Sequence, residues 1–202
     1  MVEPLILLAH GAGAASSHPW MQRWAERLGV FARVVRFDYT YMREGRRSPD
    51  RLPRLIETHR EALRAARSGH TGPVVLCGKS LGGRVGCHVA LEESVAGVVC
   101  LGYPLVGASA RRPLRDAVLR ELSTRILFVQ GTRDALCPLD QLARVRAQML
   151  APSELHVVEG GDHSLAVPKR QLAAAGEQQA DVDARACAVI RRFVELSAGA
   201  AG

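Results

Sequence analysis

The sequence predicts an α/β fold: an open, mostly parallel, doubly wound sheet of about six strands with flanking helices. Three observations support this prediction. Six short apolar runs, most of them continuous and rich in β-branched residues, are typical of strands buried on both faces. Gly, Asp or Pro follows each run, and helical patterns lie between them. The runs cover residues 5–9, 34–37, 74–77, 95–101, 126–129 and 155–158.

Apolar residues three or four positions apart mark the helices between these runs. The first pattern contains Trp20, Trp24 and Leu28, and we expect both tryptophans in the core. A second helical face extends from about residue 53 to 67. The stretch 173–180 is rich in Ala and Gln and is expected to form a loop or an irregular helix start. Alternating strands and helices imply right-handed crossovers within one sheet. The remaining stripes are Val85 and Val89; Leu114, Val118 and Leu122; Leu142, Val145 and Met149; and Val182, Ala186, Val189, Ile190 and Phe193.

Length and composition favour one globular domain over residues 1–202, because 48% of the residues are apolar. The sequence contains no apolar run of 18 residues, so neither a membrane-spanning helix nor a membrane partner is expected. The first apolar run follows Glu3 and lacks a basic segment before it, which favours a strand over a signal peptide. The simplest expected location is the cytoplasm.

The net charge of +7 raises the question of a nucleic-acid partner. Lys79 and Lys169 are the only lysines, so nearly all of the basic residues are arginines. These arginines occur beside glutamates in several helical segments and form no continuous run, and the sequence has no zinc-finger or RNA-recognition signature. We therefore expect no nucleic-acid partner.

The cysteines indicate neither a disulfide framework nor a metal site. They are five in number, scattered and without a CxxC pair, so reduced and mostly buried thiols are expected. No metal or organic cofactor is predicted. The cysteines are Cys77, Cys87, Cys100, Cys137 and Cys187.

The third apolar run ends in a G-x-S-x-G motif that spans Gly78 to Gly82 and precedes a helical pattern. A serine at the tip of a sharp strand-to-helix turn needs small neighbours on both sides, and the turn exposes its hydroxyl above the sheet. Ser80 is therefore a candidate nucleophile. The alternative is a glycine-rich turn with a capping serine. A serine–lysine dyad with Lys79 is a further alternative, but consecutive side chains on such a turn point apart.

An acid and a histidine follow two later strands. Asp134 comes after the fifth run and His163 after the sixth, so Ser80, Asp134 and His163 all follow strands at one end of the sheet. The order Ser, Asp, His is the one found with this kind of turn. Taken singly, Asp134 is equally well explained as a cap of the next helix, and His163 as a surface histidine. Asp162 is a rival acid.

The loop after the first run, from His10 to Ala14, contains small residues that allow close approach of the backbone to a substrate oxygen. The backbone N–H groups of Ala12 and Leu81 are therefore the expected oxyanion-hole donors. His10 is expected to pack or hydrogen-bond within its own loop. The loop matches neither G-x-G-x-x-G nor a Walker motif, so nucleotide binding is not predicted.

Six segments together resemble the α/β-hydrolases, in particular the compact KANL3/Tex30-like group related to dienelactone-hydrolase-like enzymes. They are LLAHGAGAASSHP, VVRFDY, CGKSLGGR, CLGYPL, FVQGTRDALCP and GGDHSLAVPKR, and they span nearly the whole chain in the right order. The resemblance implies the α/β-hydrolase fold, a Ser80–Asp134–His163 triad and the oxyanion loop. It implies no particular substrate, and some members of the group are parts of larger assemblies.

The chain is shorter than larger α/β-hydrolases in one place. Between Leu101 and Arg125 lie only 23 residues, enough for one loop and one helix and too few for a cap domain. The candidate serine is therefore expected to be open.

The predicted function is hydrolysis of ester or thioester bonds in small soluble substrates through an acyl-enzyme. The alternatives are a peptidase or acyltransferase with the same triad, and a non-catalytic interaction module that retains the fold.

Two arginine-rich loops suggest a preference for anionic substrates. Arg46 lies in the loop after Asp38, and Arg111 lies in the loop after Tyr103. If both loops fold toward Ser80, Arg46, Arg111 and Tyr103 would contact the substrate and favour an anionic ester or an acyl-phosphopantetheine thioester. The alternative is a solvated basic surface.

Overall fold

The computed structural model of the protein describes residues 2–107 and 114–199. Its centre is a six-stranded sheet in the order β2-β1-β3-β4-β5-β6, and every neighbouring pair is parallel. This confirms the predicted fold class. The strands are β1 (Leu5–Ala9), β2 (Arg33–Phe37), β3 (Val74–Lys79), β4 (Gly97–Leu101), β5 (Ile126–Gly131) and β6 (Ser153–Val158).

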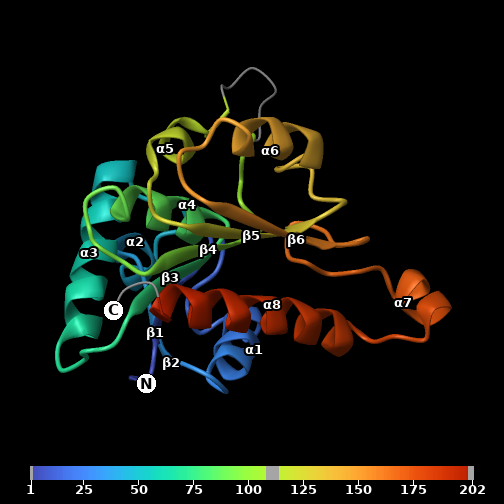
Figure 1. Cartoon of the computed structure of the whole chain (residues 1–202), viewed down its shortest axis with the longest axis horizontal. Coiled ribbons are helices and arrows are strands. Elements are labelled where there is room, and N and C mark those ends of the chain that lie inside the picture. Colours follow the sequence, from blue (N-terminus) through green and yellow to red (C-terminus); the bar gives the residue numbers. More distant parts are fainter. Residues whose placement is uncertain (1, 108–113, 200–202) are drawn as a thin grey trace.

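Helices cover both faces of the sheet (Figure 1). The helices α1 (Pro19–Leu28) and α8 (Gln179–Gly199) pack on one face, and α3 (Leu52–Arg67), α4 (Leu81–Val89), α5 (Ala117–Glu121) and α6 (Leu139–Arg146) pack on the other. Two short helices, α2 (Thr40–Arg43) and α7 (Lys169–Ala175), lie in connections.

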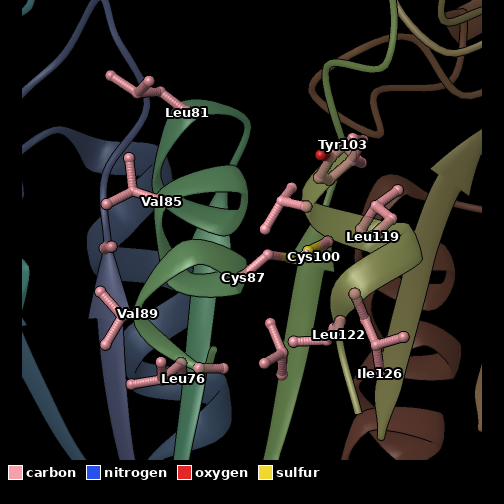
Figure 2. Close-up of a cluster of buried hydrophobic side chains, with 14 of the residues drawn as sticks. Leu76, Leu81, Val85, Cys87, Val89, Cys100, Tyr103, Leu119, Leu122 and Ile126 are labelled. Carbon is pink, nitrogen blue, oxygen red and sulfur yellow. Dashed lines mark hydrogen bonds between the residues drawn. The ribbon is translucent and has the colours of Figure 1, made fainter. Parts of the chain in front are cut away.

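The two faces of the sheet form two layers of core. Successive side chains of β1 point to opposite faces, so Leu5 and Leu7 pack toward α3 and α4, whereas Ile6 and Leu8 pack toward α1 and α8. Each of these four side chains is fully buried. Figure 2 shows part of the first layer, where side chains of α4, β4 and α5 meet. Burial on both faces explains why the four central strands, β1, β3, β4 and β5, lack an alternating polar pattern.

The strand order places a topological switch between β1 and β3. The chain moves outward from β1 to β2 and then returns to β3 on the other side of β1. Because the crossovers on the two sides cover opposite faces, a crevice opens at the carboxyl ends of β1 and β3. The loop that begins at His10 and the turn at Ser80 follow these two strands directly.

Several boundaries differ from the sequence-based expectation. The helix α5 begins at Ala117, so Leu114 lies outside it and is 38% exposed. Asp116 occupies the N-cap position, two residues after Leu114. The helix α7 was not expected, because it buries none of its seven residues and therefore has no apolar stripe.

Candidate active site

Ser80 lies at the tip of the turn between β3 and α4, with backbone angles φ 50° and ψ −111°. A residue other than glycine rarely adopts a positive φ, and holding it there costs about 1–3 kcal/mol. Two glycines make the turn possible. A Cβ atom on Gly78 would lie 2.2 Å from the nitrogen of Gly83. A Cβ atom on Gly82 would lie 2.6 Å from the carbonyl oxygen of Ala9. The structure therefore has the strained turn that the motif predicts.

Replacing Gly78 with alanine is expected to lower the free energy of unfolding by about 1–3 kcal/mol, because a methyl group cannot fit against the backbone of α4. Urea unfolding of the purified variant measures this change. Gly86→Ala in the same helix is the matched control, because its added Cβ would have no neighbour closer than 3.6 Å. Alanine there is expected to be neutral or stabilising. Equal unfolding free energies for the two variants would contradict the steric account of the turn.

The structure brings the side chains of Ser80, His163 and Asp134 into one hydrogen-bonded chain. The Nδ1 atom of His163 lies 2.7 Å from Asp134 Oδ2, and its Nε2 atom lies 2.8 Å from Ser80 Oγ. Since a carboxylate only accepts hydrogen bonds, Nδ1 carries the proton and donates to Asp134. In the neutral imidazole, Nε2 then accepts the hydrogen bond from the serine hydroxyl. The imidazole is thus oriented to take the serine proton.

The carboxylate of Asp134 is fully buried and accepts hydrogen bonds from three groups. Besides His163, these are the side-chain amide of Gln130 and the backbone N–H of Leu136 at 2.8 Å. Burial by itself would raise the pKa of Asp134, but the hydrogen bonds and the nearby imidazole outweigh it and lower the pKa. Asp134 therefore stays ionised at neutral pH. Gln130 was missed by the sequence analysis, although a polar residue at the end of an apolar strand is a usable signal.

Asp162, the rival acid, is engaged elsewhere. Its Oδ1 atom accepts hydrogen bonds from the backbone N–H groups of Ser164 at 2.7 Å and Ala166 at 3.0 Å. These bonds close the turn that carries His163, and the imidazole Nδ1 atom pairs with Asp134 instead. Asp162 therefore stabilises the shape of the loop.

The loop after β1 is held by aromatic residues that follow β2. The buried His10 accepts a hydrogen bond at Nε2 from the Tyr39 N–H at 3.1 Å, so its Nδ1–H donates to the carbonyl of Gly11 at 2.6 Å. Burial lowers the pKa of His10, which favours this neutral form. The Tyr41 hydroxyl donates to the carbonyl of Ala12 at 3.0 Å. Because C=O and N–H point opposite ways in a trans peptide, anchoring the Gly11 carbonyl turns the Ala12 N–H away from His10.

An oxyanion hole needs backbone N–H groups that make no hydrogen bond within the protein, and the two expected donors meet this requirement. Within residues 2–107 and 114–199, the N–H groups of Ala12 and Leu81 donate no hydrogen bond to the protein. Leu81 is the first residue of α4, where the helix dipole favours negative charge. Ala12 lines the pocket next to Ser80.

A pocket of about 370 Å³ lies beside Ser80 and His163. Its remaining wall is mostly apolar and includes Ala14, Trp20, Met21 and Leu136. Trp20 was expected in the core. It packs against the core layer of α1 and α8 but is only half-buried, because it also lines the pocket, where its indole N–H donates to the carbonyl of Ser164 at 3.0 Å. Trp24 is in the core as expected. Trp20 lies in the first turn of α1, next to the pocket. Helical spacing alone does not distinguish this position from a core position.

Lys79 also lines this pocket. Its ammonium group donates to the backbone carbonyl of His163 and lies 5.7 Å from the centre of the Trp20 ring. It does not hydrogen-bond to Ser80, so the structure contains no serine–lysine pair at this position.

Two of the residues expected to contact substrate, Arg46 and Tyr103, are not among the residues that line this pocket. Arg46 binds Glu44 and Asp50 through its guanidinium group, and those two carboxylates hold it in its own loop. The ring of Tyr103 is fully buried in the core, 5.8 Å from the ring of Phe128. Both placements differ from the expectation. Arg111 lies outside the described residues.

Within residues 2–107 and 114–199, no three His, Cys, Asp or Glu side chains are grouped as a metal site requires. No helix in the same ranges is long and apolar enough to cross a membrane.

Comparison with known proteins identifies the family and the fold. The family model for an alpha/beta hydrolase domain matches residues 2–195. The fold is similar to that of an alpha-beta serine hydrolase homologue from Coxiella burnetii, with a TM-score of 0.69 and 17% identity, over 96% of this chain and 85% of that one.

Two other solved structures are also similar. A dienelactone hydrolase from Anabaena variabilis has a TM-score of 0.65 and 19% identity, over 87% of this chain and 83% of that one. A serine hydrolase without a lid from Xanthomonas campestris has a TM-score of 0.66 and 15% identity, over 98% of this chain and 82% of that one. At these identities the likeness shows the fold.

Proposed function

The chain belongs to the alpha/beta hydrolase domain family, and we propose that within this family it is a serine hydrolase that cleaves ester or thioester bonds of small substrates. The observation that carries the proposal is the continuous hydrogen-bonded chain from Ser80 Oγ through His163 to Asp134, at the mouth of a pocket. Similar structures described as serine hydrolases and a dienelactone hydrolase support it.

In the proposed mechanism, Ser80 Oγ attacks the scissile carbonyl carbon while His163 Nε2 takes the serine proton. Asp134 keeps the proton of the imidazole on Nδ1 and stabilises the imidazolium that forms. The negative charge on the carbonyl oxygen is stabilised by the N–H groups of Ala12 and Leu81.

His163 then donates its proton to the leaving alcohol or thiol, which departs and leaves an acyl group on Ser80. Water attacks this acyl-enzyme with His163 again acting as base, so the acid product forms and the serine is regenerated.

The size of the pocket favours short acyl groups. A volume of about 370 Å³ is at the lower end of the range for small-molecule sites. The part of the chain between β4 and β5 that the structure describes contains one short helix, α5. We therefore expect activity to be highest on short-chain esters and thioesters.

A fluorophosphonate probe tests the proposal, because it reacts only with an activated serine. The folded protein is expected to be labelled at Ser80, as located by peptide mass spectrometry, and the heat-unfolded protein is expected to remain unlabelled. Hydrolysis rates for para-nitrophenyl esters and matching thioesters of increasing chain length then define the substrate range. A folded protein that resists the probe would instead be an interaction module that retained the fold.

A further inference from the structure

Lys79 is a buried cation inside the candidate active site. The residue is only 9% exposed, and its side chain lines the same pocket as Ser80, its neighbour in the sequence. The mechanism proposed above gives it no role. Lys79 therefore places a positive charge at the pocket that the proposed mechanism does not use.

The ammonium group of Lys79 has few contacts. It donates to the backbone carbonyl of His163 and lies over the face of the Trp20 ring, 5.7 Å from the ring centre. The backbone makes room for this arrangement at Gly102, where φ is 68°. A Cβ atom on Gly102 would lie 2.6 Å from the His163 carbonyl oxygen and 3.4 Å from Lys79 Nζ.

Lys79 has no carboxylate as an ion-pair partner in the described ranges. Every ion pair between described residues has an arginine or a histidine as its cation. The residues outside those ranges contain no Asp or Glu side chain. An ammonium group has three donors, and the one carbonyl that it binds leaves donors for a ligand.

The surroundings make this charge costly. Burial lowers the pKa of Lys79 to about 8, even though the more distant carboxylates of Asp134 and Asp162 act to raise it. The pocket wall around it is largely apolar. In such a poorly solvated site an opposite charge interacts strongly, so an anion in the pocket would offset the cost of burying the cation.

We propose that Lys79 selects substrates that carry a carboxylate a few bonds from the scissile carbonyl. This inference rests on the proposed function. Lys79 and Ser80 are adjacent in the chain and both line one pocket of about 370 Å³, and the ammonium group binds the backbone of His163, whose side chain is bonded to Ser80. A single small molecule in this pocket would then present its carbonyl to Ser80 and its carboxylate to Lys79. The sequence analysis attributed a preference for anionic substrates to Arg46 and Arg111. We attribute it instead to Lys79, at the pocket.

Matched pairs of esters test the inference. The first pair places the charge on the acyl side: the mono-para-nitrophenyl ester of glutaric acid, and the same ester with its free carboxyl blocked as a methyl ester. The second pair places it on the leaving side: the acetyl esters of hydroxybenzoic acid and of its methyl ester. For each pair the readout is the ratio of kcat/KM for the charged ester to that for the neutral ester, after subtraction of the uncatalysed rates.

In the native protein the ratio is expected to be about tenfold or more in at least one pair, which identifies the side of the substrate that Lys79 binds. Lys79→Met keeps most of the length of the side chain and removes the charge, so the ratio is expected to fall to about one. Lys79→Arg retains a cation and is expected to keep a ratio well above that of Lys79→Met. Lys169→Met, at the exposed and only other lysine, is the matched control and should leave the native ratio unchanged.

The ratio should also depend on pH. The charged groups that face the ammonium group are Asp134, Asp162 and His163, with His18 also lining the pocket. Lys79 is charged below its pKa of about 8, so the preference for the anionic ester is present there and is lost as the pH rises above it. A pH-dependent change in the rate of the triad itself affects both esters of a pair alike and cancels in the ratio. In Lys79→Arg the preference should persist at high pH.

Two results would overturn the inference. One is a native ratio near one in both pairs. The other is an equal loss of activity on the charged and neutral esters in Lys79→Met, with the ratio unchanged, which would mean that Lys79 only positions the His163 loop. Fluorophosphonate labelling of each variant separates these results from failure of the proposed function, since labelled Ser80 shows that the hydrolytic site is intact.

Discussion

Replacing Ser80 with alanine is expected to lower kcat for a short-chain ester by about 10⁴-fold or more and to abolish fluorophosphonate labelling. The substitution removes only the hydroxyl oxygen that donates to His163 Nε2 at 2.8 Å, so no acyl-enzyme can form. Residual activity would come from the N–H groups of Ala12 and Leu81 polarising the carbonyl toward attack by water. Steady-state kinetics with the activated ester, together with labelling, measures the effect.

Ser123→Ala is the matched control for this prediction. Ser123 is exposed and lies just before β5, at the end of the sheet opposite to Ser80, so native labelling and kinetics are expected. Thermal unfolding of both variants checks that the fold is retained. If Ser80→Ala is still labelled as strongly as the native protein, the nucleophile is a different residue.

Replacing Asp134 with asparagine is expected to lower kcat by about 10²–10⁴-fold. The carboxylate accepts from His163 Nδ1 at 2.7 Å, from the Leu136 N–H at 2.8 Å and from Gln130. The amide group of asparagine brings two donors into a site where all three partners donate, so one donor must face another. The imidazole then loses the tautomer in which Nε2 accepts the serine proton. Comparison of kcat for the native and variant proteins on one ester measures the loss.

Asp162→Asn provides the comparison, because Asp162 neighbours His163 in the sequence but binds the backbone of its own turn. An asparagine side-chain oxygen can accept the same two hydrogen bonds, so kcat is expected to fall far less than in Asp134→Asn. The reverse ranking would assign the orienting acid to Asp162.

Local pattern was sufficient to predict the strands that carry the candidate site. Residues Ser80, Asp134 and His163 each follow an apolar run, and in a parallel sheet such positions meet at one end. The choice between Asp134 and Asp162 needed coordinates, because both follow strands and only side-chain directions distinguish them.

Other features depend on contacts between distant segments. Trp20 reaches the pocket because α1 packs beside the loop of Ser164, which is 144 positions away in the chain. Arg46 was expected at the pocket from its charge and from its loop at a strand end, if that loop folds toward Ser80, whereas nearby carboxylates in its own loop hold its guanidinium group. Because consecutive side chains on such a turn point apart, the sequence argued against a hydrogen bond between Lys79 and Ser80, and the structure has none. The contact of Lys79 with His163 could not be predicted in this way. Such tertiary contacts leave no periodic trace in a sequence.

The exposed helix α7 is a segment where the chain should tolerate an inserted peptide. None of its seven residues is buried, and Gly176 ends it in the left-handed conformation. It lies between the His163 loop and α8, yet its backbone carries little of the packing that holds either one. Chain segments of this kind are where insertions are best tolerated. A peptide tag or a reporter domain inserted after Leu172, the one α7 residue that packs against a core layer, would therefore leave both core layers in place.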